Sequence, residues 1–170
     1  ALALIALVAV SCGENPPPTT PLALNVPQGF PPPPIPEDNP LTVEGVLLGR
    51  RLFYDPILSR DSTQSCGSCH NTSFGMTDHG LRFSVGITGA VGDRNSMPLH
   101  NLAYHTAFFW DGRAADVEAQ AKGPVLNPIE MASASEAAVE AVLDSIPGYV
   151  EAFAAAFPGE ADPLNYENMA

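Results

Sequence analysis

Two thiols and an imidazole within one short stretch carry the chemistry around which this sequence is organised. The stretch reads Ser65-Cys66-Gly67-Ser68-Cys69-His70, so the thiols lie three positions apart and His70 follows the second thiol directly. In a helical turn both thiols lie on nearly one face, from which both can reach the vinyl groups of one porphyrin. The adjacent imidazole can then bind the iron as its proximal ligand. The pattern therefore indicates covalent attachment of a c-type haem.

Two other chemistries use a Cys-x-x-Cys pair, and the sequence favours neither. A structural zinc site needs a second pair of Cys or His ligands at a similar spacing. The remaining cysteine, Cys12, lies far upstream in a different setting. A thioredoxin-like redox site belongs to a βαβ pattern, and none is visible in the sequence.

The first twelve residues have the composition of an export signal. ALALIALVAV is a continuous apolar run followed by Ser11 and Cys12, and it is too short to span a bilayer as a mature helix. A cysteine after small and aliphatic residues resembles a bacterial lipobox. We therefore expect residues 1–12 to be a partial signal peptide and Cys12 to carry a lipid anchor; an ordinary secretory signal is the alternative. Both predict an exported, periplasmic protein.

Residues 13–40 form a proline-rich segment, because residues 14–40 hold 11 of the 18 prolines. Proline is excluded from helix interiors and central strands, and it favours an extended polyproline II conformation. We expect a tether that holds the folded domain away from a membrane. A ligand for a proline-binding partner module is the alternative.

The charge balance excludes some partners. The sequence has 7 Lys and Arg against 19 Asp and Glu, a net charge of −12. This excess of acidic groups argues against binding to nucleic acid or to an anionic membrane surface. It is compatible with docking of a basic electron-donor protein.

The folded part, residues 41–170, has helical periodicity and no alternating strand pattern of convincing length. The predicted fold class is therefore mostly α: a cytochrome c-like helical haem domain with long haem-wrapping loops. Residues 162–170 look like a turn and the start of a helix without a stop signal, so we expect a fragment of a longer chain. The first expected helices are 42–54, with Thr42 as N-cap, and the haem-binding turn 65–70. A third covers 114–122 and is ended by Gly123-Pro124. A fourth is opened by a Ser133–Glu136 capping box and runs to Ile146, and a fifth runs from Pro147 to Phe157.

Five short motifs follow one another along the folded part. They are Leu48 to Ser59 (LGRRLFYDPILS), Cys66 to His70, Arg94 to Pro98 (RNSMP), Phe108 to Arg113 (FFWDGR) and Pro128 to Met131 (PIEM). Together they resemble the N-terminal, peroxidatic haem domain of the bacterial di-haem cytochrome c peroxidase family, which includes the MauG-type enzymes. The resemblance covers residues 41–170, and it implies a second haem domain that this sequence lacks.

The resemblance also implies a role for each matching residue. The positions are the thioether cysteines Cys66 and Cys69, the proximal ligand His70, the interhaem tryptophan Trp110, the distal pair Gln120 and Glu130 that handles peroxide, and the interdomain calcium ligand Asn95. The implied cofactors are haem c, one here and a second in the full-length protein, and calcium. Arg113 beside Asp111 is either a partner of a haem propionate or a plain salt bridge.

The activity that the resemblance implies is reduction of hydrogen peroxide to water. The electrons would come from a reduced cytochrome c or cupredoxin through the second haem, in a protein that can form a homodimer. Two alternatives remain open. One is MauG-like, peroxide-dependent oxidation of a partner protein. The other is a simple electron-transfer cytochrome c with Met76, Met97, Met131 or Met169 as sixth ligand.

Two positions bear on this choice. Glu130 has the apolar neighbours Ile129 and Met131, which should raise its pKa towards that of a general acid–base group; a solvated glutamate is the alternative. Ile87 stands where the family's reductively activated peroxidases carry a loop histidine that binds the iron at rest. An isoleucine cannot bind iron, and His79, His100 and His105 lie elsewhere. We therefore expect an open distal site, as in MauG-type members.

Overall fold

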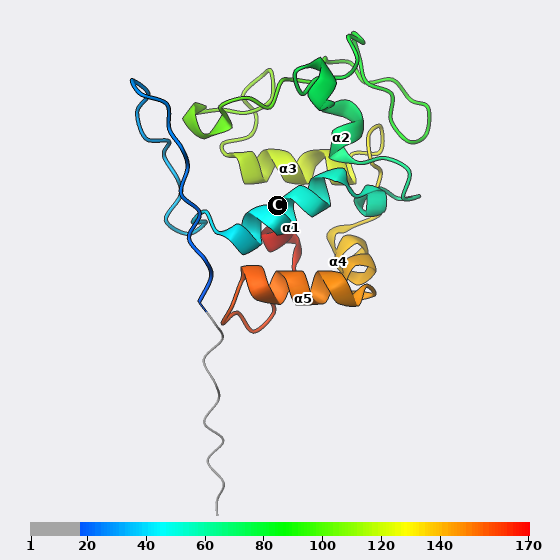
Figure 1. Cartoon of the computed structure of the whole chain (residues 1–170). Coiled ribbons are helices and arrows are strands. Elements are labelled where there is room, and N and C mark those ends of the chain that lie inside the picture. Colours follow the sequence, from blue (N-terminus) through cyan, green and yellow to red (C-terminus); the bar gives the residue numbers. More distant parts are fainter. Residues whose placement is uncertain (1–17) are drawn as a thin grey trace, which may run out of the picture.

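The computed structural model describes residues 18–170 (Figure 1). The expected signal peptide and the acylation of Cys12 lie outside the described residues. Within them the chain is mostly helical, and its β pairing is limited to isolated bridges, which confirms the mostly α class. No helix in this range has the length and apolar character needed to cross a membrane. The elements are α1 Val43–Tyr54, η1 Pro56–Leu58, α2 Cys66–Cys69, η2 Thr72–Phe74, η3 Leu102–Tyr104, α3 Val117–Leu126, α4 Glu136–Asp144, α5 Pro147–Ala156 and α6 Tyr166–Met169, with η denoting 3₁₀ helices.

Helix α1 forms as the sequence predicts. The Thr42 hydroxyl accepts a hydrogen bond from the N–H of Gly45 at 3.0 Å and so caps the first turn. Leu48 and Leu52 lie one turn apart and are both buried. Asp55 ends the helix in an extended conformation before a proline. One face of α1 therefore belongs to the hydrophobic core.

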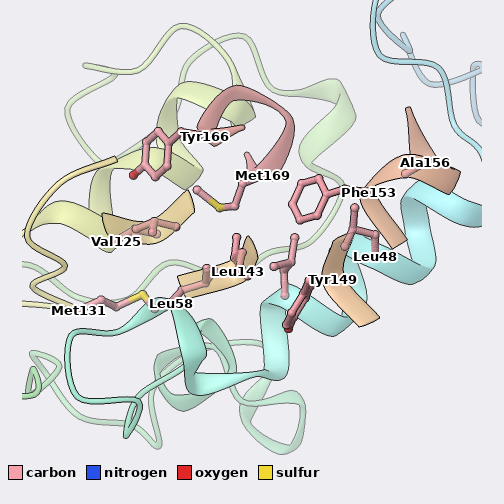
Figure 2. Packing of buried hydrophobic residues seen from close by; sticks show 12 residues of the cluster. Leu48, Leu58, Val125, Met131, Leu143, Tyr149, Phe153, Ala156, Tyr166 and Met169 are labelled. Atoms are coloured by element: carbon pink, nitrogen blue, oxygen red, sulfur yellow. The ribbon is translucent and has the colours of Figure 1, made fainter. Parts of the chain in front are cut away.

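In the core α5 packs against α1 and α4, and α4 packs against α6 (Figure 1). The long loops between α2 and α3 lie on the other side of α1, and α2 packs on α1 as well. The core therefore supports the helix on which the haem-binding turn rests. Figure 2 shows Phe153 of α5 between Met169 and Leu48. Burial of each large side chain stabilises the fold by about 1.5–3 kcal/mol. The core residues are Leu48, Leu52, Leu58, Val125, Met131, Val139, Leu143, Tyr149, Phe153, Ala156, Tyr166 and Met169.

The prediction for the helix at 114–122 is wrong at both ends. Ala114 pairs with Phe108 in an isolated bridge, and the helix begins only after Asp116, whose carboxylate accepts from the N–H of Ala119 at 2.7 Å. At the other end α3 continues through Pro124 to Leu126. The burial of the following residue, Val125, in the core explains why packing overrides the local preference of proline here. Residues 124–126, which were expected to follow the end of this helix, consequently belong to it.

The capping box at Ser133 is also wrong by two residues. Helix α4 begins at Glu136 and is capped by Ser135, whose hydroxyl accepts from the N–H of Ala138 at 3.2 Å. The Ser133 hydroxyl donates to the carbonyl of Leu58 at 2.6 Å instead. A hydrogen bond to a distant residue thus engages the Ser133 side chain, which the local sequence pattern assigned to the helix cap. Ile146, expected inside the helix, precedes α5.

The described part of the proline-rich segment, residues 18–40, forms no helix, as its composition predicts. An isolated bridge between Pro21 and Thr42 and side-chain hydrogen bonds at three places hold it to the domain. Thr20 donates to the Glu44 carboxylate from its N–H at 2.9 Å and from its hydroxyl at 2.8 Å. The Tyr104 hydroxyl donates to the carbonyl of Pro31 at 2.7 Å, and Asn39 donates to Glu118 at 2.8 Å. The tether prediction did not include this attachment, and the role of the segment stays a prediction.

Candidate functional site

A cavity of about 590 Å³ lies between α2, α3 and the loops that connect them. Its volume is in the range typical of ligand and cofactor sites. All seven residues singled out in the sequence line it, although they are spread from position 66 to position 130: Cys66, Cys69, His70, Asn95, Trp110, Gln120 and Glu130. Folding therefore brings the predicted site residues together around one space.

The three remaining histidines lie away from this cavity. His79 packs on the ring of Phe74, with ring centroids 4.1 Å apart, and within residues 18–170 neither His79 nor His100 is among the lining residues. His105 lines a smaller neighbouring cavity of about 260 Å³. That smaller cavity shares Trp110 and Gln120 with the main one, but none of the three histidines is among the residues that line the space where His70 lies.

The two thiols lie on α2, which is a single helical turn. The N–H of His70 donates to the carbonyl of Cys66 at 2.9 Å, so the imidazole follows directly from the turn that carries the thiols. Both thiols are free and partly buried. Burial raises the pKa of Cys66 to about 11, and burial also raises the pKa of Cys69. Redox-active Cys-x-x-Cys pairs have a lowered thiol pKa, so this environment disfavours the redox interpretation.

The zinc interpretation lacks its other ligands. Among residues 18–170 no group of three or more His, Cys, Asp or Glu side chains is placed to hold a metal ion. A structural zinc site requires four such ligands. A haem needs one axial imidazole and two thiols for the thioether bonds, and this part of the chain supplies that set.

The imidazole of His70 is held in one tautomer by its surroundings. Its Nδ1 lies 3.0 Å from the carbonyl oxygen of Met76. A carbonyl can only accept, so Nδ1 carries the proton and Nε2 keeps its lone pair. A metal-binding histidine ordinarily has this arrangement. His70 is therefore prepared to bind iron through Nε2.

Glu130 and Gln120 reach the cavity from neighbouring elements. Gln120 lies on α3, and Glu130 lies in the turn after that helix. Burial raises the pKa of the Glu130 carboxyl, the direction predicted from its apolar neighbours, although a hydrogen bond from Asn127 opposes the shift. The Asn127 amide donates to Oε1 of Glu130 at 2.7 Å. The site thus contains a fixed carboxylate whose pKa is shifted towards that of a general acid–base group.

The loop at 83–87 forms one wall of the cavity and contains no imidazole. Val85 and Gly86 line the cavity, whereas Ile87 is not among the lining residues of the described chain. The N–H of Ile87 donates to the carbonyl of Glu130 at 3.0 Å. On the other side, the Gln64 amide donates to the carbonyl of Val85 at 2.9 Å. The loop is thus fixed at both sides without presenting an iron ligand.

Two arginines line the cavity beside acidic side chains. The Asp111 carboxylate pairs with Arg94 and with Arg113, the latter at 2.9 Å. The two guanidinium groups hold the pKa of Asp111 well below its usual range. The groups are about half exposed, so the pairs contribute little to stability. Asp93 and Glu130 also line the cavity, so its wall has no excess of positive charge. Each guanidinium nevertheless has N–H donors beyond those that bind Asp111, and these can bind a haem propionate.

Trp110 and Asn95 are linked at the mouth of the cavity. Trp110 is 63% exposed, and its indole Nε1 donates to the backbone carbonyl of Asn95 at 3.0 Å. The Asn95 side-chain amide donates to the carbonyl of Leu81 at 2.9 Å. Its amide oxygen stays available as a ligand. An exposed indole is held beside a free oxygen donor.

Sequence reasoning missed four residues that support the site: Gln64, Arg94, Ser96 and Asn127. Arg94 and Ser96 belong to the RNSMP motif, but nothing local assigns a role to either. Gln64 and Asn127 act on the backbone of Val85 and the side chain of Glu130 respectively. Gln64 meets its partner only in the folded chain, whereas Asn127 lies three residues before Glu130, where residue type alone assigns no role.

The donor set and the cavity define the class of protein: a helical domain with a site for a c-type haem. The family model described as di-haem cytochrome c peroxidase matches residues 43–170. The chain therefore belongs to the di-haem cytochrome c peroxidase family, whose members are peroxide-dependent oxidoreductases containing haem c.

Similar proteins come from both branches of this family. The chain is 44% identical to cytochrome c551 peroxidase of Pseudomonas aeruginosa, over 81% of this chain and 41% of that protein. It is 47% identical to the methylamine utilization protein MauG of Methylorubrum extorquens, over 80% of this chain and 38% of that protein. The crystal structure of a MauG-like protein associated with microbial copper homeostasis matches with a TM-score of 0.80 and 35% identity, over 87% of this chain and 43% of that one. The chain spans about two fifths of the length of these relatives.

Proposed function

We propose that this chain is the peroxide-reducing haem domain of a di-haem cytochrome c peroxidase. Hydrogen peroxide, two protons and two electrons give two molecules of water. The electrons come from a reduced cytochrome c or cupredoxin through a second haem domain, which the di-haem family and the partial coverage of its relatives support. The observation that carries the proposal is that Glu130 and Gln120 line the same cavity as His70 and the two thiols.

The haem, when bound, supplies the electrons and the metal centre for cleavage of the O–O bond. Cys66 and Cys69 attach it, and His70 holds the iron through Nε2. Glu130 accepts a proton from one peroxide oxygen and returns it to the other as the bond breaks, which is the role of a general acid–base group. Its raised pKa suits both steps. Asn127 fixes the carboxylate, and the Gln120 amide donates a hydrogen bond to peroxide.

The remaining residues of the site supply charge and an electron route. Arg94 and Arg113 would bind the haem propionates, since each guanidinium has N–H donors beyond those that bind Asp111. Exposed Trp110 would carry electrons from the second haem. Asn95 would hold a calcium ion through its amide oxygen, and its backbone carbonyl holds the indole of Trp110 beside that position.

The assay for this proposal is peroxide-dependent oxidation of a reduced cytochrome c or cupredoxin by the haem-loaded protein together with its second haem domain. We expect steady turnover that requires peroxide. A protein that reacts rapidly with peroxide and does not oxidise either donor would contradict the peroxidase assignment.

A MauG-like function is the second candidate, and one observation favours it. The loop at 83–87 has Ile87 at the histidine position and presents no imidazole to the cavity. Such an open site reacts without prior reduction and suits oxidation of a side chain on a partner protein. In this case peroxide consumption is fast, the small redox proteins are not oxidised, and a partner protein gains an oxidised side chain.

The arrangement of the four methionines argues against a simple electron carrier. Met169 and Met131 belong to the hydrophobic core, and the carbonyl of Met76 binds the other nitrogen of His70. Met97 is the methionine that lines the cavity without belonging to the core cluster. The electron-carrier alternative therefore depends on Met97 as sixth ligand.

We also propose that the protein is exported to the periplasm and anchored by a lipid on Cys12. The apolar run before this cysteine supports both statements. Labelling of cells with a radioactive fatty acid, compared between wild type and Cys12→Ala, tests the anchor. Incorporation that is equal in the two proteins would contradict it.

A further inference from the structure

A serine far from the haem-binding motif contacts the proximal ligand. The Ser96 hydroxyl donates to the backbone carbonyl of Cys69 at 2.7 Å. The same oxygen lies 3.3 Å from Nδ1 of His70. Ser96 lies 26 residues further along the chain than His70, in the loop that also carries Arg94 and Asn95. Neither the attachment motif nor the distal pair accounts for this contact.

The positions of the protons determine what Ser96 can do. Its single hydroxyl proton points to the Cys69 carbonyl, which can only accept. Towards His70 the hydroxyl oxygen therefore acts as an acceptor. The Met76 carbonyl is also an acceptor for the same Nδ1–H, at 3.0 Å. The proton on Nδ1 is thus shared between two acceptors, from two separate segments.

The first acceptor depends on a strained turn. Met76 has a φ of +61°, in the left-handed region that a residue with a side chain rarely adopts. The turn is closed by two hydrogen bonds, from the N–H of Met76 to Asn71 at 2.9 Å and from the N–H of Asn71 to Thr77 at 3.1 Å. Strained backbone persists only where the surrounding structure determines it. Ser96 supplies a second support for the ring that does not depend on this turn.

We propose that Ser96 is a positioning residue for the proximal ligand. Its hydroxyl holds the His70 ring with the proton on Nδ1 and links the ring to the carbonyl of Cys69. A hydrogen bond from Nδ1–H to an acceptor raises the basicity of the opposite nitrogen, the one that binds the metal. Ser96 therefore strengthens the bond from Nε2 to iron and lowers the reduction potential of the haem. The inference rests on the proposed ligation of haem by His70 and is independent of the electron donor.

A purely structural role gives different results. If Ser96 only fastens its loop to α2 through the Cys69 carbonyl, its removal lowers thermal stability and leaves the electronic properties of the iron–histidine bond unchanged. The test therefore needs a readout on that bond. The frequency of the iron–histidine stretching vibration in the ferrous protein and the midpoint potential of the haem provide two.

The experiment compares Ser96→Ala with wild type in the haem-loaded protein. We expect a lower iron–histidine frequency and a higher midpoint potential, because Nε2 becomes less basic. Ser96→Thr, which keeps the hydroxyl, should restore both values. Ser73→Ala is the matched control, because Ser73 is exposed in the neighbouring turn. It should leave both values at those of wild type.

A second pair of variants keeps the test decisive if Ser96→Ala loses its fold. Ser96→Thr and Ser96→Val have the same shape and differ only in the hydroxyl, so a difference in frequency and potential between them supports the proposal. Equal values in this pair, or wild-type values in Ser96→Ala, overturn it even if stability falls. An iron–histidine vibration that is unchanged in His70→Ala overturns the proposed haem ligation as well, which separates the two failures.

Discussion

Gly86 lies so close to the carbonyl oxygen of Ile129 that a Cβ at position 86 would be 1.6 Å from that oxygen. No side chain larger than hydrogen fits there without movement of the backbone. The neighbouring N–H of Ile87 binds the carbonyl of Glu130. The loop that forms the distal wall is therefore packed directly on the peptide that carries the candidate acid–base residue.

Gly86→Ala should displace this loop and with it Glu130. We expect a loss of stability of about 1–3 kcal/mol, as for other overpacked sites, and slower reaction with peroxide. Thermal unfolding and stopped-flow mixing with peroxide measure the two effects. Gly49→Ala is the control, because its Cβ meets nothing within 4 Å and it should stabilise α1 by about 0.5–1 kcal/mol. Wild-type stability and rate in Gly86→Ala would show that the close packing is unimportant.

Glu130→Gln should leave haem attachment intact and slow the reaction with peroxide by about two to four orders of magnitude. The amide keeps an oxygen that can accept from Asn127, so geometry is retained while the base is lost. The wild-type rate should also fall with decreasing pH, with a midpoint above the usual pKa of glutamate. Glu151→Gln on the exposed face of α5 is the control. An unchanged rate in Glu130→Gln would identify Glu130 as a passive carboxylate.

The raised pKa of Glu130 also fixes the sign of a pH effect on stability. Its pKa is higher in the folded than in the unfolded chain, because burial disfavours the charge. The group therefore favours folding below the unfolded pKa, and this contribution is lost as pH rises through the folded pKa. We expect Glu130→Gln to gain stability relative to wild type as pH increases from 3 to 7. Thermal unfolding across this range should show the gain; a constant difference would contradict it.

Tyr149→Phe should destabilise the fold without affecting the site. The fully buried Tyr149 donates from its hydroxyl to Asp55 at 2.8 Å, and the guanidinium of Arg51 lies 3.8 Å from its ring centroid. Loss of the donor leaves a carboxylate oxygen without its partner, at a cost of about 1–3 kcal/mol. Denaturant unfolding measures the loss. Tyr54→Phe is the control, because Tyr54 is exposed, and it should change stability by less than about 0.5 kcal/mol. Equal losses of stability in the two variants would contradict a stabilising role for the Tyr149 hydroxyl.

Local signals predicted the parts of this domain whose cause is local. The cap at Thr42, the end of α1 at Asp55 and the thiol pair of α2 each depend on a few neighbouring residues. The errors arise where distant packing prevails, as at Pro124, which stays helical because the next residue is buried in the core. No sequence pattern indicated that the Gln64 side chain would donate a hydrogen bond to Val85, which lies 21 residues away.

The residues of the site were more predictable from the sequence than the residues that hold them in place. The residues proposed to act on haem and peroxide belong to motifs with a chemical reason for each side chain, and they all line one cavity. Ser96 and Asn127 act through hydrogen bonds to other site residues. A serine or an asparagine has many roles in loops, so residue type alone could not assign these.

The central claim is that His70 binds a haem whose opposite side is open to peroxide beside Glu130. The most direct test is the optical and electron paramagnetic resonance spectrum of this haem in the ferric state. We predict a high-spin iron without a methionine–iron absorption band, because the distal loop presents no ligand and the core holds Met131 and Met169. A low-spin spectrum with a methionine–iron band would contradict the account, and it would identify the domain as an electron carrier with Met97 as its sixth ligand.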